Sequence, residues 1–289
     1  MSLSRTVLGM EFQNPVLLAA GTCGFGRELR EVLDLEALGG IVTKSVTLEP
    51  RAGNPAPRVA EIPGAMLNSV GLANPGVDAV VRDHLPWLRD HVRRPRVWVS
   101  VAGHALDEYV EVVSRLEDHE GFQAFELNLS CPNVGGTPFA LDHGALAQVL
   151  SAVRPRTARP LVVKLAPNAP DLAATAQVAV DAGADALTVV NTLPGLSLDP
   201  ASGTPRLGAG AGGLSGPPLK AVGVAAVRRI RDRVDVPVVG VGGILTAEDA
   251  REYLVAGASL VQIGTGSFAA PRISERVIRG LERERRRHA

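Results

Sequence analysis

Residues 236–266, VPVVGVGGILTAEDAREYLVAGASLVQIGTG, contain two short apolar runs on either side of an amphipathic segment. Apolar runs of this length, rich in Val and bounded by Gly or Pro, predict buried strands. The segment between them predicts a helix with Thr246 as its N-cap and with Glu248 and Asp249 in its first turn, where acidic groups favour the helix dipole. A strand, a helix and a second strand in this order are typical of a parallel sheet.

The same alternation runs through the rest of the chain. Helical patterns follow six earlier apolar runs, which are PVLLAA (15–20), GIVTKSV (40–46), VWVSVAG (97–103), AFELNLS (124–130), LVVKLAP (161–167) and ALTVVNT (186–192). Eight units of this kind predict the α/β class and a closed (β/α)8 TIM barrel that spans residues 1–289 as a single domain, with an open doubly wound sheet as the alternative. TVLGMEFQN (6–14) predicts an N-terminal hairpin around Gly9 that caps the bottom of the barrel.

Two connections are too long to be simple turns between a strand and a helix. Residues 47–75 follow the second predicted strand, and residues 193–217 follow the sixth. Loops of this length inside a compact domain usually have a function, and both leave the carboxyl ends of strands, where barrel active sites lie. We therefore expect two long loops to contribute to an active site.

Composition narrows the class of protein. The 289 residues include 30 basic and 30 acidic side chains, so no general field attracts nucleic acid or an anionic membrane surface. Two cysteines form neither a disulfide framework nor a metal site, and the N-terminus has no apolar signal region. We expect a cytoplasmic protein with no membrane association, no resident metal and no nucleic-acid partner.

Polar residues gather at the ends of the predicted strands. These residues are Lys44, Ser45, Ser100, Asn128, Ser130, Lys164, Asn191 and Thr192. Lysine occurs elsewhere only at Lys220, and a parallel barrel has no exposed edge strand on which a lysine could be solvated. Lys44 and Lys164 are therefore predicted to act at the mouth of the barrel.

Glycines and one cysteine complete the candidate site. GVGGI (240–244) and IGTG (263–266) end the last two predicted strands, where barrels often bind a phosphate through backbone N–H groups. No Rossmann or P-loop motif occurs. Cys131 follows the fourth strand between Asn128 and Asn133, and it could be a small buried residue or a nucleophile or general base. Cys23 fits a structural role in a glycine-rich turn.

Nearly the whole chain resembles the dihydroorotate dehydrogenases, flavin enzymes of pyrimidine synthesis that are (β/α)8 barrels. Ordered motifs carry the resemblance: TKSVTLEPRAGNPAPRVAE, MLNSVGLANPG, ELNLSCPNVGG, VVKLAPN, VVNTLPG, GGLSGPPLK, VPVVGVGGI and IGTGSF. It implies oxidation of dihydroorotate to orotate with FMN as cofactor. Cys131 would remove the C5 proton while a hydride passes from C6 to the flavin.

The resemblance also implies a role for each remaining site residue. Lys164 would lie beside the polar edge of the flavin, and Lys44 between the flavin and the substrate carboxylate. The expected substrate-binding residues are Lys44, Asn68, Ser69, Val70, Gly71, Leu72, Asn128, Asn133, Asn191 and Thr192. The expected FMN-binding residues are Ala20, Gly21, Lys44, Ser45, Ser100, Asn128, Lys164, Val190, Gly216, Gly242, Gly243, Gly264 and Thr265.

Cysteine at the base position marks the non-membrane class 1 of the family. GNPAPRVAE, AMLNSVGLANPG and GGLSGPPLK resemble the B-type branch, in which a second subunit carrying FAD and an iron–sulfur cluster passes electrons to NAD. The implied assembly is a homodimeric core within a heterotetramer. The chain departs from the family pattern at Ala20, at Ser100 and in a short loop after Val134.

Other functions fit parts of the pattern. An A-type enzyme would act alone with fumarate, and a related dihydropyrimidine oxidoreductase would have another substrate. A non-catalytic flavin-binding barrel, or a phosphate-binding isomerase or aldolase without flavin, would keep the glycines but would not need Cys131, Lys44 and the four asparagines. The tail LERERRRHA (281–289) is interpreted as a solvated helix end.

Overall fold

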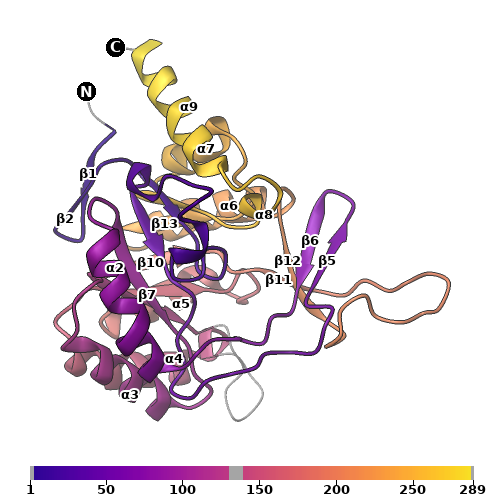
Figure 1. The fold of residues 1–289 in the computed structure, drawn as a ribbon, viewed down its shortest axis with the longest axis horizontal. Coiled ribbons are helices and arrows are strands. Elements are labelled where there is room, and N and C mark those ends of the chain that lie inside the picture. The colour runs from indigo at the N-terminus through magenta and orange to yellow at the C-terminus, as the bar shows by residue number, and fades with distance from the viewer. Residues whose placement is uncertain (1–2, 130–138, 288–289) are drawn as a thin grey trace.

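A computed structural model describes residues 3–129 and 139–287 of the chain. Its centre is a closed barrel of eight strands, all paired in parallel, in the order β10-β13-β14-β3-β4-β7-β8-β9 (Figure 1). The strands are β3 (Val16–Leu18), β4 (Gly40–Val42), β7 (Arg96–Val101), β8 (Ala124–Asn128), β9 (Leu161–Leu165), β10 (Ala186–Val189), β13 (Val238–Val241) and β14 (Leu260–Ile263). The predicted barrel is confirmed.

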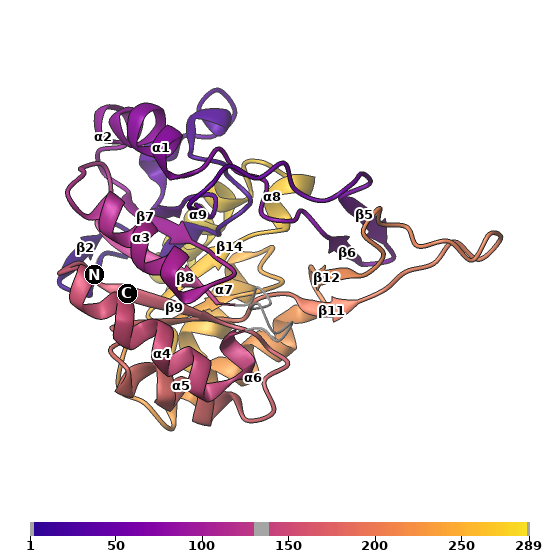
Figure 2. The same ribbon diagram turned by 90° about the horizontal axis from the view of Figure 1, so that it is seen from below.

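Helices cover the outside of the barrel (Figure 2). They are α1 (Val77–Ala79), η3 (Val80–His84), α2 (Leu85–His91), α3 (Leu106–Glu117), η4 (Phe139–Leu141), α4 (His143–Val153), η5 (Arg154–Arg156), α5 (Leu172–Asp181), α6 (Leu219–Arg231), α7 (Ala247–Ala256), α8 (Gly266–Ala269) and α9 (Ile273–Arg287). Thr246 caps α7, because its side chain accepts from the Asp249 N–H while the Asp249 carboxylate accepts from the Thr246 N–H.

The first unit departs from the predicted alternation. Only two short 3₁₀ turns, η1 (Arg27–Leu29) and η2 (Leu35–Ala37), lie between β3 and β4. Gly24 and Gly26 have φ angles of 55° and 88°, which a right-handed helix does not accommodate. The expectation of a helix after every strand is therefore wrong at this position.

An apolar layer fills the lower interior of the barrel. Every barrel strand contributes one residue to it: Leu17, Val42, Trp98, Ala124, Val162, Ala186, Val239 and Leu260. Val7 and Phe12 join this cluster from the antiparallel hairpin of β1 (Arg5–Val7) and β2 (Met10–Phe12). The Phe12 ring meets the Trp98 ring edge-on at 6.1 Å, so the hairpin contributes to the lower core, as the predicted cap at the bottom requires.

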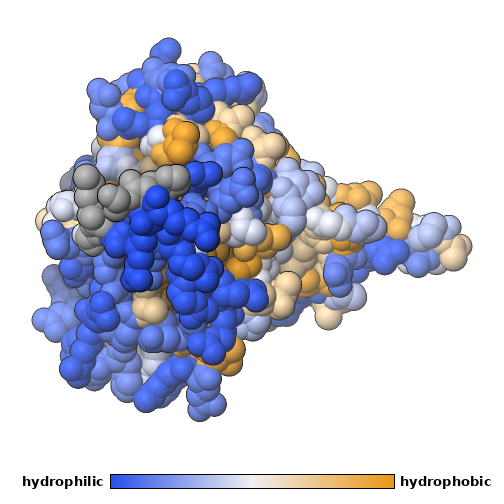
Figure 3. Space-filling model, turned by 90° about the horizontal axis from the view of Figure 1, so that it is seen from above, coloured by the Kyte–Doolittle hydropathy of each residue, from blue (hydrophilic) through white to orange (hydrophobic). Residues whose placement is uncertain are grey.

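The two long connections do more than form loops. They supply β5 (Val59–Ile62), β6 (Ala65–Asn68), β11 (Leu193–Gly195) and β12 (Gly212–Ser215), which pair as an antiparallel sheet in the order β11-β12-β6-β5. This sheet and the chain between β11 and β12 project to one side of the barrel, and we call them the arm (Figures 1 and 2). Orange, hydrophobic surface lies along the arm in Figure 3. Leu196 and Leu198, between β11 and β12, are exposed large hydrophobic residues.

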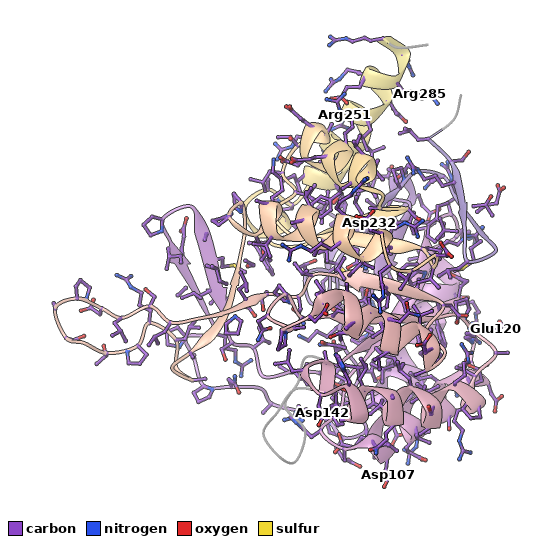
Figure 4. All side chains as sticks on the ribbon, turned by 180° about the vertical axis from the view of Figure 1, so that it is seen from behind. Asp107, Glu120, Asp142, Asp232, Arg251 and Arg285 are labelled. Atoms are coloured by element: carbon purple, nitrogen blue, oxygen red, sulfur yellow. The ribbon has the colours of Figure 1, made fainter. Side chains whose placement is uncertain are left out.

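Figure 4 shows charged side chains on the outside of the molecule. The six labelled in Figure 4 lie on the outer helices and turns, from Asp107 at the start of α3 to Arg285 near the end of α9. In the part of the chain that the structure describes, no helix combines the length and apolar character that a bilayer crossing requires.

Candidate active site

A buried polar layer lies directly above the apolar layer inside the barrel. Side chains two residues apart on a strand face the same side, so the residues that follow the apolar layer also point inward. They include Ser100, Glu126, Lys164, Thr188 and Gln262, which are 0%, 0%, 7%, 0% and 0% exposed. We refer to these five residues as the polar layer.

Glu126 is the acidic member of the polar layer. Its Oε2 accepts hydrogen bonds from Thr188 Oγ1 and Gln262 Nε2, both at 2.8 Å. Its Oε1 lies 3.9 Å from Lys164 Nζ and has no hydrogen-bond partner among the described residues. Three strands thus fix the carboxylate beneath the mouth of the barrel, with the Lys164 ammonium beside it.

Two carboxamides meet above this layer. Asn191 Nδ2 lies 3.3 Å from Asn128 Oδ1, and Asn191 Oδ1 accepts a 2.8 Å hydrogen bond from the Thr192 N–H. The Tyr109 hydroxyl donates to the Asn128 carbonyl at 2.9 Å and fixes the end of β8. Val190 is buried directly before Asn191. Amide groups that both donate and accept suit a ring edged with C=O and N–H groups.

The opposite side of the mouth follows β3 and β4. The Ser45 and Ser100 hydroxyl oxygens are 2.9 Å apart and buried, and the Lys44 N–H donates to the Gly24 carbonyl at 2.7 Å. The Lys44 side chain is half-buried. Ala20 and Gly21 lie in the turn after β3, and Gly21 is exposed.

The arm reaches the mouth through Asn68 and Thr192. Asn68 Nδ2 donates to the Gly213 carbonyl at 3.2 Å, which joins β6 to β12. Thr192 packs against the same strand, since a Cβ at Gly213 would lie 2.0 Å from Thr192 Oγ1. A glycine is therefore needed where the arm approaches the barrel.

The expected substrate loop, Ser69 to Leu72, follows β6 and is held by the segment that precedes β5. The Ser69 N–H donates to the Arg58 carbonyl at 2.8 Å, and the Val70 carbonyl accepts from the Asn54 N–H at 3.0 Å. Gly71 packs against Asn54, and Leu72 has a φ of 55°. These hydrogen bonds join the loop to residues 54–58 and do not join it to the barrel strands.

A glycine cradle lies at the ends of β13 and β14. Gly216, Gly242 and Gly243 have φ angles of 104°, 127° and 68°. A Cβ at Gly243 would lie 2.8 Å from the backbone nitrogen of Lys220, whereas one at Gly264 would meet nothing closer than Ala19 Cβ at 3.6 Å. Thr265 Oγ1 donates to Ser215 Oγ at 2.8 Å, which links the two sides of the cradle.

Tyr253 locks this cradle from below. Its hydroxyl donates to the Gly242 carbonyl at 2.8 Å, with the Val241 carbonyl at 3.3 Å. Burial raises the pKa of Tyr253, so the phenol stays protonated and remains a donor. Lys220 bridges Asp249 and Glu252 at 2.8 and 2.9 Å, and these hydrogen bonds raise the pKa of the lysine. Backbone groups without side chains, beside a fixed turn, fit the phosphate of the expected FMN.

Three expected positions cannot be compared with the structure. Cys131 and Asn133, with Ser130, lie outside the described residues. On either side of them, the Ala140 N–H donates to the Leu129 carbonyl at 3.0 Å. Described residues on the two sides of this segment are therefore joined next to Asn128.

Sequence reasoning missed Glu126, Thr188, Gln262 and Tyr253. A signal was present for Glu126, because it shares strand parity with Asn128 in AFELN and is a charged residue in a barrel strand. Glu126, like Lys164, lies in a parallel barrel that has no exposed edge strand on which its charge could be solvated. Tyr253 carried no such signal, since an aromatic residue on an amphipathic helix is ordinary core.

Comparisons with known proteins show the family to which the chain belongs. A family model described as dihydroorotate dehydrogenase matches residues 2–284. The catalytic subunit of dihydroorotate dehydrogenase B (NAD(+)) from Geotalea uraniireducens is 45% identical over 97% of this chain and 92% of its own length. A putative dihydroorotate dehydrogenase A (fumarate) from Solibacter usitatus is 46% identical over 98% of this chain and 94% of its own.

A solved structure extends the similarity to three dimensions. The crystal structure of the Eimeria tenella dihydroorotate dehydrogenase in complex with ferulenol superposes with a TM-score of 0.81. It is 27% identical to this chain and covers 96% of it, and the chain covers 83% of that structure.

Proposed function

The chain belongs to the dihydroorotate dehydrogenase family, whose members are FMN-dependent oxidoreductases of pyrimidine biosynthesis, and from this premise we propose that it is the catalytic subunit of a B-type enzyme. The family match over residues 2–284 is the observation that carries the activity. The proposal treats residues 1–289 as one FMN-binding barrel domain that oxidises dihydroorotate to orotate.

FMN would lie across the mouth of the barrel. Gly216, Gly242, Gly243, Gly264 and Thr265 would hold its phosphate, with backbone N–H groups as donors. The remaining contacts would come from Ala20, Gly21, Lys44, Ser45, Ser100, Asn128, Lys164 and Val190. When bound, FMN supplies the hydride acceptor that no side chain provides. The ammonium of Lys164 would give positive charge at the polar edge of the ring.

The substrate would be held by groups that match its edge. Asn128 and Asn191, whose side chains meet at 3.3 Å, would bind the ring amides together with Asn68, Asn133 and Thr192. Lys44 would pair with the carboxylate of the substrate. The loop from Ser69 to Leu72, which follows β6, would cover the ring.

Cys131 would act as the general base. As a thiolate it would take the proton from C5 of dihydroorotate, while the carboxamides hold the ring in place. The transfer needs the Cys131 sulfur on one face of the substrate, within hydrogen-bonding reach of that proton.

An anaerobic visible spectrum of the purified chain tests the activity. We expect a flavin spectrum that bleaches when dihydroorotate is added. If the chain retains FMN and the flavin stays oxidised after dihydroorotate is added, dihydroorotate is excluded as a substrate of the isolated subunit. A chain that binds no FMN on reconstitution would contradict the flavin assignment as well.

The electron acceptor separates the two branches. The names of the relatives favour the B-type, since the NAD-dependent relative is described as a catalytic subunit and so implies a second subunit. We expect co-expression with an FAD and iron–sulfur subunit to give a heterotetramer around a homodimer that reduces NAD. Turnover of the isolated chain with fumarate would instead support the A-type, as in the Solibacter usitatus relative.

A further inference from the structure

We propose that Glu126 is a positioning residue that holds Lys164 beside the polar edge of the flavin and, through its negative charge, lowers the reduction potential of bound FMN. This inference rests on the proposed function only for the place of FMN at the mouth of the barrel. It assigns a role to a buried carboxylate that the proposed steps do not otherwise use.

The Glu126 carboxylate lies at an unusual place for a charged group. Glu126 is fully buried inside the barrel, where an ionised group is costly unless it is paired and hydrogen-bonded. A structural role alone would be met by an apolar residue like those in the layer below. The position therefore demands a function for the charge.

Hydrogen bonds hold the Glu126 carboxylate through one of its two oxygens. Thr188 and Gln262 both donate to Oε2 at 2.8 Å, so the side chain is fixed without help from Lys164. Oε1 is left for the ammonium, at 3.9 Å, which is an ion pair longer than a hydrogen bond. In the described part of the chain, Glu126 is the acidic group that pairs with Lys164.

The charges of Lys164 and Glu126 act on the flavin in opposite directions. A positive charge beside the flavin favours its reduced, anionic form, and a negative charge behind that ammonium opposes the effect. The low dielectric of the barrel interior leaves both charges poorly screened. The pair therefore tunes the potential, with Lys164 raising it and Glu126 lowering it.

Glu126→Gln tests the proposal, because the amide keeps the size of the side chain and can still accept from Thr188 and Gln262. The midpoint potential is measured on the FMN-loaded protein by dye-coupled reduction without dihydroorotate. We expect Glu126→Gln to bind reduced FMN at least tenfold more tightly relative to oxidised FMN. This corresponds to a rise of about 30 mV or more for two electrons. An unchanged or lower potential overturns the proposal.

Thr188→Val is the matched control, since it removes one hydrogen bond to the same oxygen without altering charge. We expect Thr188→Val to change the affinity for reduced FMN relative to oxidised FMN by less than threefold, as read from the midpoint potential. A shift as large as that of Glu126→Gln would assign the effect to the hydrogen bonds of the carboxylate rather than to its charge, and would overturn the proposal. If Glu126→Gln does not fold, Glu126→Asp withdraws the carboxylate by one methylene and should raise the potential by less, and no rise would refute the proposal.

This test separates the inference from the enzyme assignment. The potential requires bound FMN but no substrate. A wild-type protein that binds FMN and is not reduced by dihydroorotate would refute the assigned substrate, while the comparison of the two potentials would still decide the role of Glu126.

Discussion

A double-variant cycle at Tyr253 and Gly223 tests how the cradle is held. The Tyr253 ring fits between β13 and α6 because both elements present a glycine to it. A Cβ at Gly240 would lie 2.3 Å from Tyr253 Cδ1, and one at Gly223 would lie 1.9 Å from its hydroxyl oxygen. We expect Gly223→Ala to destabilise the protein although it lies inside a helix.

Three free-energy contributions decide whether Gly223→Ala stabilises or destabilises the protein. Alanine in a helix interior is favoured over glycine by about 1 kcal/mol. Overpacking a well-packed core costs about 1–3 kcal/mol, and displacing the hydroxyl from the Gly242 carbonyl forfeits a hydrogen bond of about 1 kcal/mol. The two costs exceed the gain, so we expect a net loss of about 1–3 kcal/mol.

Tyr253→Phe isolates the contribution of the hydroxyl. It removes the oxygen that the new methyl would strike, and the closest remaining atom is Cζ at 2.9 Å. Alone it should cost about 1–2 kcal/mol, because it takes the donor from the Gly242 carbonyl. In the Tyr253→Phe background, Gly223→Ala should be less costly than in the wild type by at least about 1 kcal/mol, a coupling typical of residues in contact.

Urea denaturation at a fixed, saturating FMN concentration measures the free energies of unfolding, and equal m-values would allow the comparison. Gly144→Ala is the control, since Gly144 is exposed in α4 and its Cβ would meet only the Asp142 side chain, at 3.3 Å. It should change stability by less than about 1 kcal/mol. Additive effects within about 0.5 kcal/mol, or stabilisation by Gly223→Ala, would refute the reasoning.

Three further predictions concern thiols and acid stability. Cys131→Ala should bind FMN but slow its anaerobic reduction by dihydroorotate about 10²–10⁴-fold in stopped-flow spectra, and near-normal reduction would exclude the role of base. Burial raises the pKa of Cys23 to about 12. In Cys131→Ala, iodoacetamide should therefore label this remaining thiol only after denaturation, as mass spectrometry would show, and labelling of the native protein would contradict its burial. Hydrogen bonds from Arg272 hold the pKa of Glu275 below its ordinary value of 4.5, so stability present above this pH should be lost as the pH falls below it. In thermal unfolding, the stability of Glu275→Gln should fall less than that of the wild type as the pH decreases through this range. Equal slopes of stability against pH for the two proteins would refute the assignment.

The barrel and its mouth could be predicted because they follow from a period of two along short strands. The same parity that buries Trp98 and Val162 brings Ser100 and Lys164 to the layer above. Glu126 could have been predicted in the same way, because it is a charged residue in a barrel strand, as Lys164 is.

The arm could not be predicted in the same way. Its strands are short, and GGLS (212–215) has little intrinsic preference for a strand. What holds it is pairing between distant segments, such as the hydrogen bond from Asn68 to Gly213 across 145 residues. The missing helix after β3 has a local cause, the positive φ angles of Gly24 and Gly26, but glycine in a sequence does not reveal which φ it adopts.

The candidate site is built from two parts of the fold, the barrel and the arm, and these parts are held in different ways. Residues expected to meet the flavin, such as Lys164, rest on barrel strands and on the polar layer below them, so their positions are set by close packing and buried hydrogen bonds. Residues expected to meet the substrate ring from the arm, such as Asn68, depend on a small sheet outside the barrel. Substitutions in the polar layer should therefore act on the properties of FMN, whereas substitutions in the arm should act on the binding of dihydroorotate.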